Sequence, residues 1–365
     1  MTDFEELPDL ASERLGGAVL AANDEFFAPK EGLLKPGPAE WREGEYTERG
    51  KWMDGWETRR HSPDHDWCII RLGAPGMVRG VVADTAFFRG NYPEHCSLEG
   101  CSVPGTPSAA ELAHAEWTEI LPKSPLLGDH KNRFDVSHDR RLTHLRFHIY
   151  PDGGVARLRV HGEVVPEWTR FARSGGEVDL AAMENGGWVV SCSDMFFGDR
   201  QNLVLPGRST HMGDGWETRR RRGPGHDWSI VRLAAPGTIH RVEIDTDHFK
   251  GNAPERCTLE AIHLPGATAD ALAAPSAPWT PLLAETGLQP HARHRFEDQV
   301  IAAGPATHVR LNVFPDGGIA RLRLFGVLDA RHSGGEGGGG DSGGGEIGRG
   351  EIDRGEGSGG GSGGG

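Results

Sequence analysis

The chain has 365 residues, of which 36% are hydrophobic, and its formal net charge is −14 from 39 basic and 53 acidic side chains. This balance argues against a nucleic-acid backbone or an anionic membrane as the main partner. No apolar stretch approaches 18 residues, and Met1–Glu13 carries acidic residues where a secretory signal would be basic and then apolar. The five cysteines fit no CxxC pattern, so we predict a cytoplasmic protein with free thiols.

A heptapeptide, Asp-Gly-Trp-Glu-Thr-Arg-Arg, stands at residues 54–60 and again at residues 214–220. The match extends on both sides, because His-Asp-Trp at 65–67, Gly-Asn at 90–91 and Pro-Asp-Gly-Gly at 151–154 recur at 226–228, 251–252 and 315–318. A period this long indicates a duplicated domain, and insertions in loops explain why the offset varies. We therefore predict a first domain over residues 1–165 and a second over residues 180–328.

Alternating apolar and polar residues predict strands in each domain. Residues 144–150 place three apolar side chains on a buried face and polar side chains, with His144 and His148 among them, on a solvated face. Pro151–Gly154 predicts a tight turn, and hence a hairpin with the strand that follows. Other strands are predicted at 67–72, 78–84, 96–102, 228–233, 238–245 and 257–262, and short helices at 109–115 and 268–273. Short strands separated by Gly and Pro indicate an all-β fold, an antiparallel sandwich or jelly roll.

The heptapeptide gathers an acid, two guanidinium groups and an indole. Arg59, Arg60, Arg219 and Arg220 are candidates for binding a small carboxylate, because an arginine can hold one with two parallel hydrogen bonds. Beside them Glu57 and Glu217 could accept or relay a proton. A structural role fits equally well: Trp56 and Trp216 would fill the cores, Asp54 and Asp214 would cap turns, and the arginines would form ion pairs within each domain.

Two further pairs of residues are candidates for the site. His65-Asp66 and His226-Asp227 directly precede a strand and are candidate general acids or bases, although adjacent strand residues point to opposite faces. The alternative is a capping Asp beside an exposed His. Asn91 and Asn252 follow a glycine in a loop, where each would bind a ureido or carboxylate group or occupy a left-handed turn.

The sequence predicts no metal site. His144 and His148 share a strand face, but the residue that corresponds to His148 is Asn312, and no HExxH motif accompanies them. The arginines around each Pro-Asp-Gly-Gly motif are expected to pair with acids more often than to line an anion site. Residues 334–365 hold 19 of the 54 glycines and almost no apolar residue, so we predict a disordered acidic tail.

Together these motifs resemble those of the allantoicase family, over roughly Leu15–Val327. The similar segments are ANDEFFAPKEGLL from Ala22, DGWETRRHSPDHDWCIIRLGAPG from Asp54, DTAFFRGNYPEHCSLEG from Asp84, GWVVSCSDMFFG from Gly187, DGWETRRRRGPGHDWSIVRL from Asp214 and FPDGGIARLRLFG from Phe314. One difference is Asn23, where the family pattern leads us to expect Ser.

The resemblance implies two tandem galactose-binding-like jelly rolls and the hydrolysis of allantoate to ureidoglycolate and urea. In that reaction we expect Arg59 or Arg219 to hold the substrate carboxylate, and Asn91 or Asn252 to bind a ureido group. Glu57, Glu217 or a His-Asp pair would then activate water or protonate the leaving nitrogen. No cofactor is predicted, while dependence on a divalent metal and assembly into a homo-oligomer stay open. The alternative is a non-catalytic tandem jelly-roll module that binds a small anion or a sugar, or that serves assembly.

Overall fold

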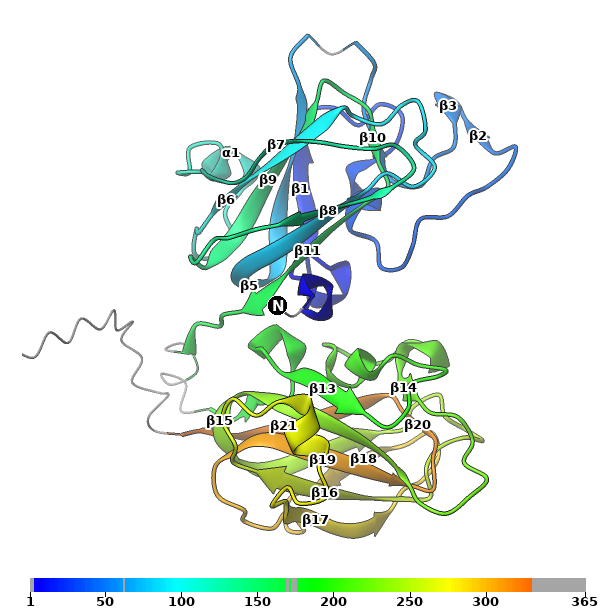
Figure 1. Ribbon diagram of the computed structural model, residues 1–365, viewed down its shortest axis with the longest axis vertical. Helices are drawn as coiled ribbons and strands as arrows, with labels where there is room; N and C mark the ends of the chain where they lie inside the picture. Colours follow the sequence, from blue (N-terminus) through cyan, green and yellow to red (C-terminus); the bar gives the residue numbers. More distant parts are fainter. Residues whose placement is uncertain (1–2, 62, 169–170, 172–175, 330–365) are drawn as a thin grey trace, which may run out of the picture. The chain divides into compact units, whose positions relative to one another are not determined.

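The structure is a computed structural model that describes residues 3–61, 63–168, 171 and 176–329 (Figure 1). The predicted acidic tail, residues 334–365, lies outside the described residues. No helix in the described ranges has both the length and the apolar character needed to cross a membrane. All five cysteines are free, which agrees with the prediction from their spacing.

The first repeat is built around one strand, β5 (Asp66–Asp84). The first half of β5 pairs with β1 (Ala18–Ala22) and β9 (Leu142–Tyr150), and its second half pairs with β8 (Lys131–Asp135) and β11 (Arg157–Val164). The pairing with β9 shifts in register between Arg71 and Gly76, within the sequence LGAPG. One strand therefore belongs to both layers of an antiparallel jelly-roll sandwich. Beyond β9 the first layer continues through β6 (His95–Cys101) and β7 (Thr118–Pro125).

Two expectations from the sequence are wrong in the first repeat. The predicted strands 67–72 and 78–84 are halves of β5, because the backbone stays extended through the intervening LGAPG segment. The hairpin after residues 144–150 does not form, since β9 and β11 pair with opposite halves of β5 and not with each other. Between them β10 (Gly154–Val155) pairs with β4 (Trp56–Glu57). The Pro-Asp-Gly-Gly turn thus carries the chain from one layer to the other, past the heptapeptide.

The second repeat has the same architecture around β15 (Asp227–Asp245). The first half of β15 pairs with β13 (Trp188–Cys192) and β19 (Ala306–Phe314), and its second half with β18 (Arg293–Phe296) and β21 (Arg321–Leu328). The remaining strands are β12 (Val178–Asp179) on β21, β16 (Arg256–Ile262) on β19, β17 (Thr280–Gly287) on β16, and the pair β14 (Trp216–Glu217) and β20 (Gly318–Ile319).

Helices are few and short in the described residues. The two α-helices are α1 (Ala109–Leu112), which a Ser108 capping box begins, and α3 (Ala269–Ala273), which Thr268 caps. Both lie where the sequence predicts them. The 3-10 helices are η1 (Phe4–Glu6), η2 (Glu13–Leu15), η3 (Lys30–Leu34), η4 (Met183–Asn185), η5 (Arg200–Val204) and η6 (Met212–Asp214).

The two heptapeptide tryptophans belong to the cores. Trp56 and Trp216 are fully buried, and each indole Nε1 donates a hydrogen bond of 2.8 Å to a backbone oxygen, that of Asp24 or Asp194. Such a plug supplies a large apolar area while its one polar atom stays satisfied. The structural role considered for these residues is therefore confirmed.

The inner face of β9 is confirmed, but its other face is not solvated as predicted. Leu145, Phe147 and Ile149 are fully buried, and His144 and His148 on the opposite face are also buried. A small apolar cluster covers part of that face, with Ile69, Cys101 and Leu112 at its centre. The strand pattern distinguishes two faces but does not indicate what lies over the second one.

The repeats differ most in the segment that precedes the heptapeptide. Both contain Pro-Gly, at residues 36–37 and 206–207, but 16 residues (38–53) then follow in the first repeat and six (208–213) in the second. We call residues 38–53 the insertion segment. It contains a small hairpin of β2 (Tyr46–Thr47) and β3 (Gly50–Lys51), which projects from the sandwich in Figure 1.

Candidate functional site

Glu57 is held in place by backbone hydrogen bonds on both sides. Its strand, β4, pairs with β10, where Gly154 is its partner. On the other edge the amides of Glu57 and Ala28 each bond to the other residue's carbonyl at 3.2 Å. The backbone of Glu57 is thus fixed from two directions, so its side chain extends from a rigid point.

Asn91 is fixed next to Glu57 through the same turn. The amide of Gly154 donates to the Asn91 carbonyl at 2.8 Å, and Asn91 Nδ2 donates to Glu57 Oε1 at 2.7 Å. A Cβ on Gly154 would lie 1.9 Å from the Phe88 ring, so only glycine permits this close approach. The Pro-Asp-Gly-Gly turn therefore brings the heptapeptide and the Gly-Asn loop together.

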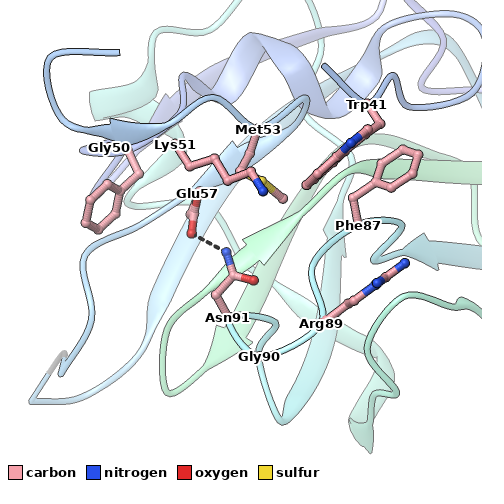
Figure 2. A pocket seen from close by; sticks show the side chains of 10 residues that line it. Trp41, Gly50, Lys51, Met53, Glu57, Phe87, Arg89, Gly90 and Asn91 are labelled. Atoms are coloured by element: carbon pink, nitrogen blue, oxygen red, sulfur yellow. Dashed lines mark hydrogen bonds between the residues drawn. The ribbon is translucent and has the colours of Figure 1, made fainter. Parts of the chain in front are cut away.

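This pair lies in a cavity of about 630 Å³, shown in Figure 2. The volume falls in the range of roughly 300–1,000 Å³ that is usual for small-molecule sites. Four apolar side chains, four polar ones and two glycines line its walls. The insertion segment supplies four of the ten lining residues: Trp41, Gly50, Lys51 and Met53. The other six are Phe27, Glu57, Phe87, Arg89, Gly90 and Asn91.

Burial changes the acidity of Glu57. Its exposed fraction is 7%, and this burial raises the pKa of the carboxyl, while the hydrogen bond from Asn91 and the charge of Arg60 act in the opposite direction. A carboxyl group with a raised pKa in a cavity is suited to donate and accept protons.

Two cations line the cavity, and they differ in their partners. Arg89 is largely exposed and forms an ion pair with Asp129 at 3.0 Å. Lys51 Nζ lies 3.9 Å from the centre of the Trp41 ring, and no carboxylate among the described residues pairs with it. In Figure 2 the Lys51 chain extends across the cavity toward Trp41. Lys51 is therefore the cation most available to an anionic ligand.

The structure separates the two heptapeptide arginines from each other. Arg59 is exposed and turns to Asp24, with Nε 2.9 Å from the Asp24 carboxylate, and its guanidinium also stacks on Phe26. Arg60 Nε lies 2.9 Å from Asp152, and its Nη1 donates to the carbonyl of Gly90 at 3.4 Å. Arg60 thus lies at the edge of the cavity, whereas Arg59 does not line it.

The structure also separates His65 from Asp66. Asp66 is buried and its Oδ1 accepts from Asn23 at 2.9 Å; burial raises the pKa of this carboxyl. His65 lies on the other side, where its Nε2 is 3.0 Å from Nδ1 of His148, which in turn contacts Glu99 at 2.8 Å. As strand geometry indicates, the two side chains point apart, and neither lines the Glu57 cavity.

The second repeat places its corresponding residues in a smaller cavity of about 420 Å³. Asn252 again hydrogen-bonds Glu217, and Arg220 lines the wall, but Glu217 is partly exposed. Residues 208–213 stand in place of the longer insertion segment there, and Met212 of this stretch contacts Asn252. Outside this cavity Arg219 pairs with Asp194 at 3.2 Å, His226 contacts Asn312 at 3.3 Å, and Asp227 pairs with Arg221.

Reasoning from the sequence missed Lys51, Trp41 and Met53. All three lie in the insertion segment, outside every duplicated motif. A comparison of the two repeat lengths would have found them, because a segment present in only one repeat marks a difference between their sites.

In the part of the chain that the structure describes, no group of three or more His, Cys, Asp or Glu side chains is arranged to hold a metal ion. The groups around Glu57 can do proton chemistry on a small anion. The cavity offers a cation for the charge, an amide to orient the ligand and a buried carboxyl group for proton transfer.

Comparisons of sequence and of structure with known proteins agree on one family. A protein-family model, the allantoicase repeat, matches residues 8–165 and 178–329. The chain is 50% identical over 323 residues to a probable allantoicase of Burkholderia mallei, covering 88% of the chain and 94% of that protein. It is 48% identical over 321 residues to the allantoicase of Dictyostelium discoideum, covering 87% and 86%. The crystal structure of allantoicase from Saccharomyces cerevisiae superposes with a TM-score of 0.73 at 34% identity, covering 88% of this chain and 93% of that one.

Proposed function

We propose, from the premise that the chain belongs to the allantoicase family and hydrolyses allantoate to ureidoglycolate and urea, that the reaction takes place in the Glu57 cavity. Allantoate is a small carboxylate whose central carbon carries two ureido groups. It therefore needs a cation, groups that recognise amides, and a proton donor for the departing urea. The Glu57 cavity offers one residue for each of these needs.

Glu57 transfers the protons. Hydrolysis replaces the bond between the central carbon and one ureido nitrogen with a bond between that carbon and the oxygen of water. The leaving nitrogen gains a proton to become urea, and the water loses one to become the hydroxyl group of ureidoglycolate. A single carboxyl group can donate the first proton and accept the second. Its burial supports this role, because the raised pKa keeps the protonated form accessible closer to neutral pH.

Lys51 holds the substrate carboxylate. No carboxylate among the described residues competes for Lys51, whose ammonium group lies over the Trp41 ring. Asn91 keeps Glu57 in position through Nδ2, which leaves its Oδ1 to accept an N–H of a ureido group. Arg60 at the cavity edge adds positive charge near Glu57. Arg59 has no role in this assignment, because it pairs with Asp24 outside the cavity.

The observation that carries this proposal is the buried carboxyl group of Glu57 beside Asn91, in a cavity lined by a lysine that pairs with no carboxylate of the described residues. The test is urea release from allantoate by the purified chain, assayed with an added divalent metal and with a chelator. We expect urea in both assays, because proton transfer alone balances the reaction and the proposal includes no cofactor.

The variant Glu57→Gln is expected to lower kcat by roughly 10²- to 10⁴-fold, the usual contribution of a general acid or base. Its melting temperature shows whether the fold is retained. A folded Glu57→Gln protein with wild-type kcat would remove Glu57 from the mechanism. A wild-type chain that releases no urea under either condition would refute the activity itself.

A further inference from the structure

The second repeat keeps the polar part of the pocket. Asn252 Nδ2 donates to Glu217, and the Gly318 amide holds the Asn252 carbonyl at 2.9 Å, as Gly154 holds Asn91. The cavity of about 420 Å³ around them is still large enough for a small ligand. The groups that would recognise an amide are thus present twice in the chain.

Arg220 gives this second pocket a cation of its own. It lines the cavity, and no carboxylate among the described residues pairs with it, whereas its counterpart Arg60 is bonded to Asp152. The neighbouring Arg221 is already paired with Asp227, and its amide donates to Asp316 at 2.7 Å. A guanidinium without a protein partner at a cavity wall can bind a ligand carboxylate with two parallel hydrogen bonds.

The acidic side chains of the second pocket suit the rest of such a ligand. Glu217, Glu255 and Asp316 line the cavity and can accept hydrogen bonds. A ureido group presents several N–H donors and no positive charge. A molecule with one carboxylate and one or two ureido groups therefore complements both the arginine and the acids, whereas a simple anion meets three carboxylates.

The second pocket lacks what the proposed chemistry requires. With no insertion segment above them, Phe196 and Phe197 are each 61% exposed, and Glu217 remains open to water. No lysine or tryptophan corresponds to Lys51 or Trp41. A partly exposed glutamate in a cavity with no lysine among its lining residues does not reproduce the Glu57 site.

We propose that the second pocket is a non-catalytic binding site for ureido acids, which are the substrate allantoate or its product ureidoglycolate. This inference rests on the proposed function, because it takes the ligand class from the reaction in the first repeat. The chain then binds one class of molecule at two sites and hydrolyses it at one.

The test measures binding of allantoate to the full chain carrying Glu57→Gln, so that the ligand survives, by calorimetry or equilibrium dialysis. We expect two sites per chain. Adding Arg220→Met should weaken one of them about tenfold or more, as expected for loss of a charge-assisted bidentate contact. The matched control is Arg219→Met, which removes the adjacent arginine outside the cavity and should change neither site.

Two results would overturn the proposal. One is a single binding site that Lys51→Met abolishes and Arg220→Met leaves intact. The other is two binding sites that both remain intact in the Arg220→Met protein. The melting temperature of the Arg220→Met protein shows whether this variant retains its fold. Urea release by the wild-type chain is measured separately, so a failure of the proposed reaction is distinguishable from a failure of the second site.

Discussion

The two repeats have the same fold and the same heptapeptide, yet they enclose very different pockets. Glu57 and Glu217 occupy matching strand positions, and each accepts a hydrogen bond from a matching asparagine. Only Glu57 is buried, and only its cavity is lined by residues of the insertion segment. The same residue at matching strand positions thus has different surroundings in the two repeats, and in the first repeat burial raises the pKa of the Glu57 carboxyl.

Other duplicated residues are equivalent in the two repeats. Arg157 Nη2 lies 2.5 Å from Asp54 Oδ2, and Arg321 Nη2 lies 3.1 Å from Asp214 Oδ2. These buried pairs join the strand after the Pro-Asp-Gly-Gly turn to the start of the heptapeptide. Residues that serve the fold should thus respond equally to substitution in both repeats, and residues that serve the site should not.

The largest difference is expected between Glu57→Gln and Glu217→Gln. The first should lower kcat by roughly 10²- to 10⁴-fold, and the second by less than about tenfold, because only the first glutamate is buried. Steady-state urea release measures both. Equal losses in the two folded variants would mean that both repeats are catalytic or that neither glutamate acts.

Substitution of the buried tryptophans should affect the two repeats equally. Trp56→Ala and Trp216→Ala each leave a large cavity, and we expect each to lower the free energy of unfolding of its own repeat by about 3–5 kcal/mol. Denaturant titrations followed by fluorescence and circular dichroism measure this loss. A clearly smaller loss for one tryptophan would show that the cores are not equivalent.

Lys51→Met tests whether the insertion segment supplies a cation that binds the substrate as well as part of the cavity wall. Loss of a charged hydrogen-bond donor to the substrate carboxylate should lower kcat/KM by roughly 10- to 100-fold, mainly through KM. The neighbouring cation Arg89 is the control: Arg89→Met removes an exposed group that already pairs with Asp129 and should have a smaller effect. If the two variants lose the same amount, the carboxylate is not held by Lys51 in particular.

The contribution of Glu57 to the free energy of unfolding should also depend on pH. Its pKa is raised above the ordinary value of 4.5, so the folded protein holds this proton more tightly than the unfolded chain does. The stabilisation is present below the unfolded pKa and is lost as the pH rises through the folded pKa. The free energy of unfolding of the wild type minus that of Glu57→Gln should thus be larger near about pH 4 than near about pH 8. A difference that stays constant with pH would show that burial does not perturb Glu57.

The smallest effects are expected at Arg59 and Arg219, and they should be alike. Both side chains are mostly exposed and pair with an aspartate outside the cavities, so alanine should cost about 0–1 kcal/mol of stability in either repeat. Turnover should change by less than about threefold in both, a change that the urea assay resolves. A large loss of turnover for Arg59→Ala alone would restore the interpretation that this arginine binds the substrate.

Much of the fold could be predicted because its signals are local. The alternation over residues 144–150 identifies the inner face of β9, and the duplicated motifs give the two jelly rolls. The pairing of strands was harder, since Pro151–Gly154 is compatible with a hairpin as well as with a crossing between layers. Which one forms depends on β5, whose two halves offer partners to β9 and β11 separately.

Only some of the candidate site residues from the sequence line the two cavities. Glu57, Asn91 and Asn252 were candidates from the sequence and lie in the cavities, whereas His65 and Asp66 point apart and Arg59 pairs with Asp24. Because the two heptapeptides are identical, their sequence cannot show which arginine forms an ion pair with an aspartate of its own repeat and which one does not. That choice depends on contacts between segments distant in the chain.

By itself, the sequence determined the duplication, the β-rich fold and the family, because these depend on motifs and periodicities that are written locally. The tertiary structure decided which of two identical glutamates is buried. The buried one lies in a cavity that the insertion segment, residues 38–53, helps to line, on a strand paired with β10 from about 100 residues further along the chain. A proton-transfer group is defined by its surroundings as much as by its side chain, and those surroundings exist only once the chain has folded.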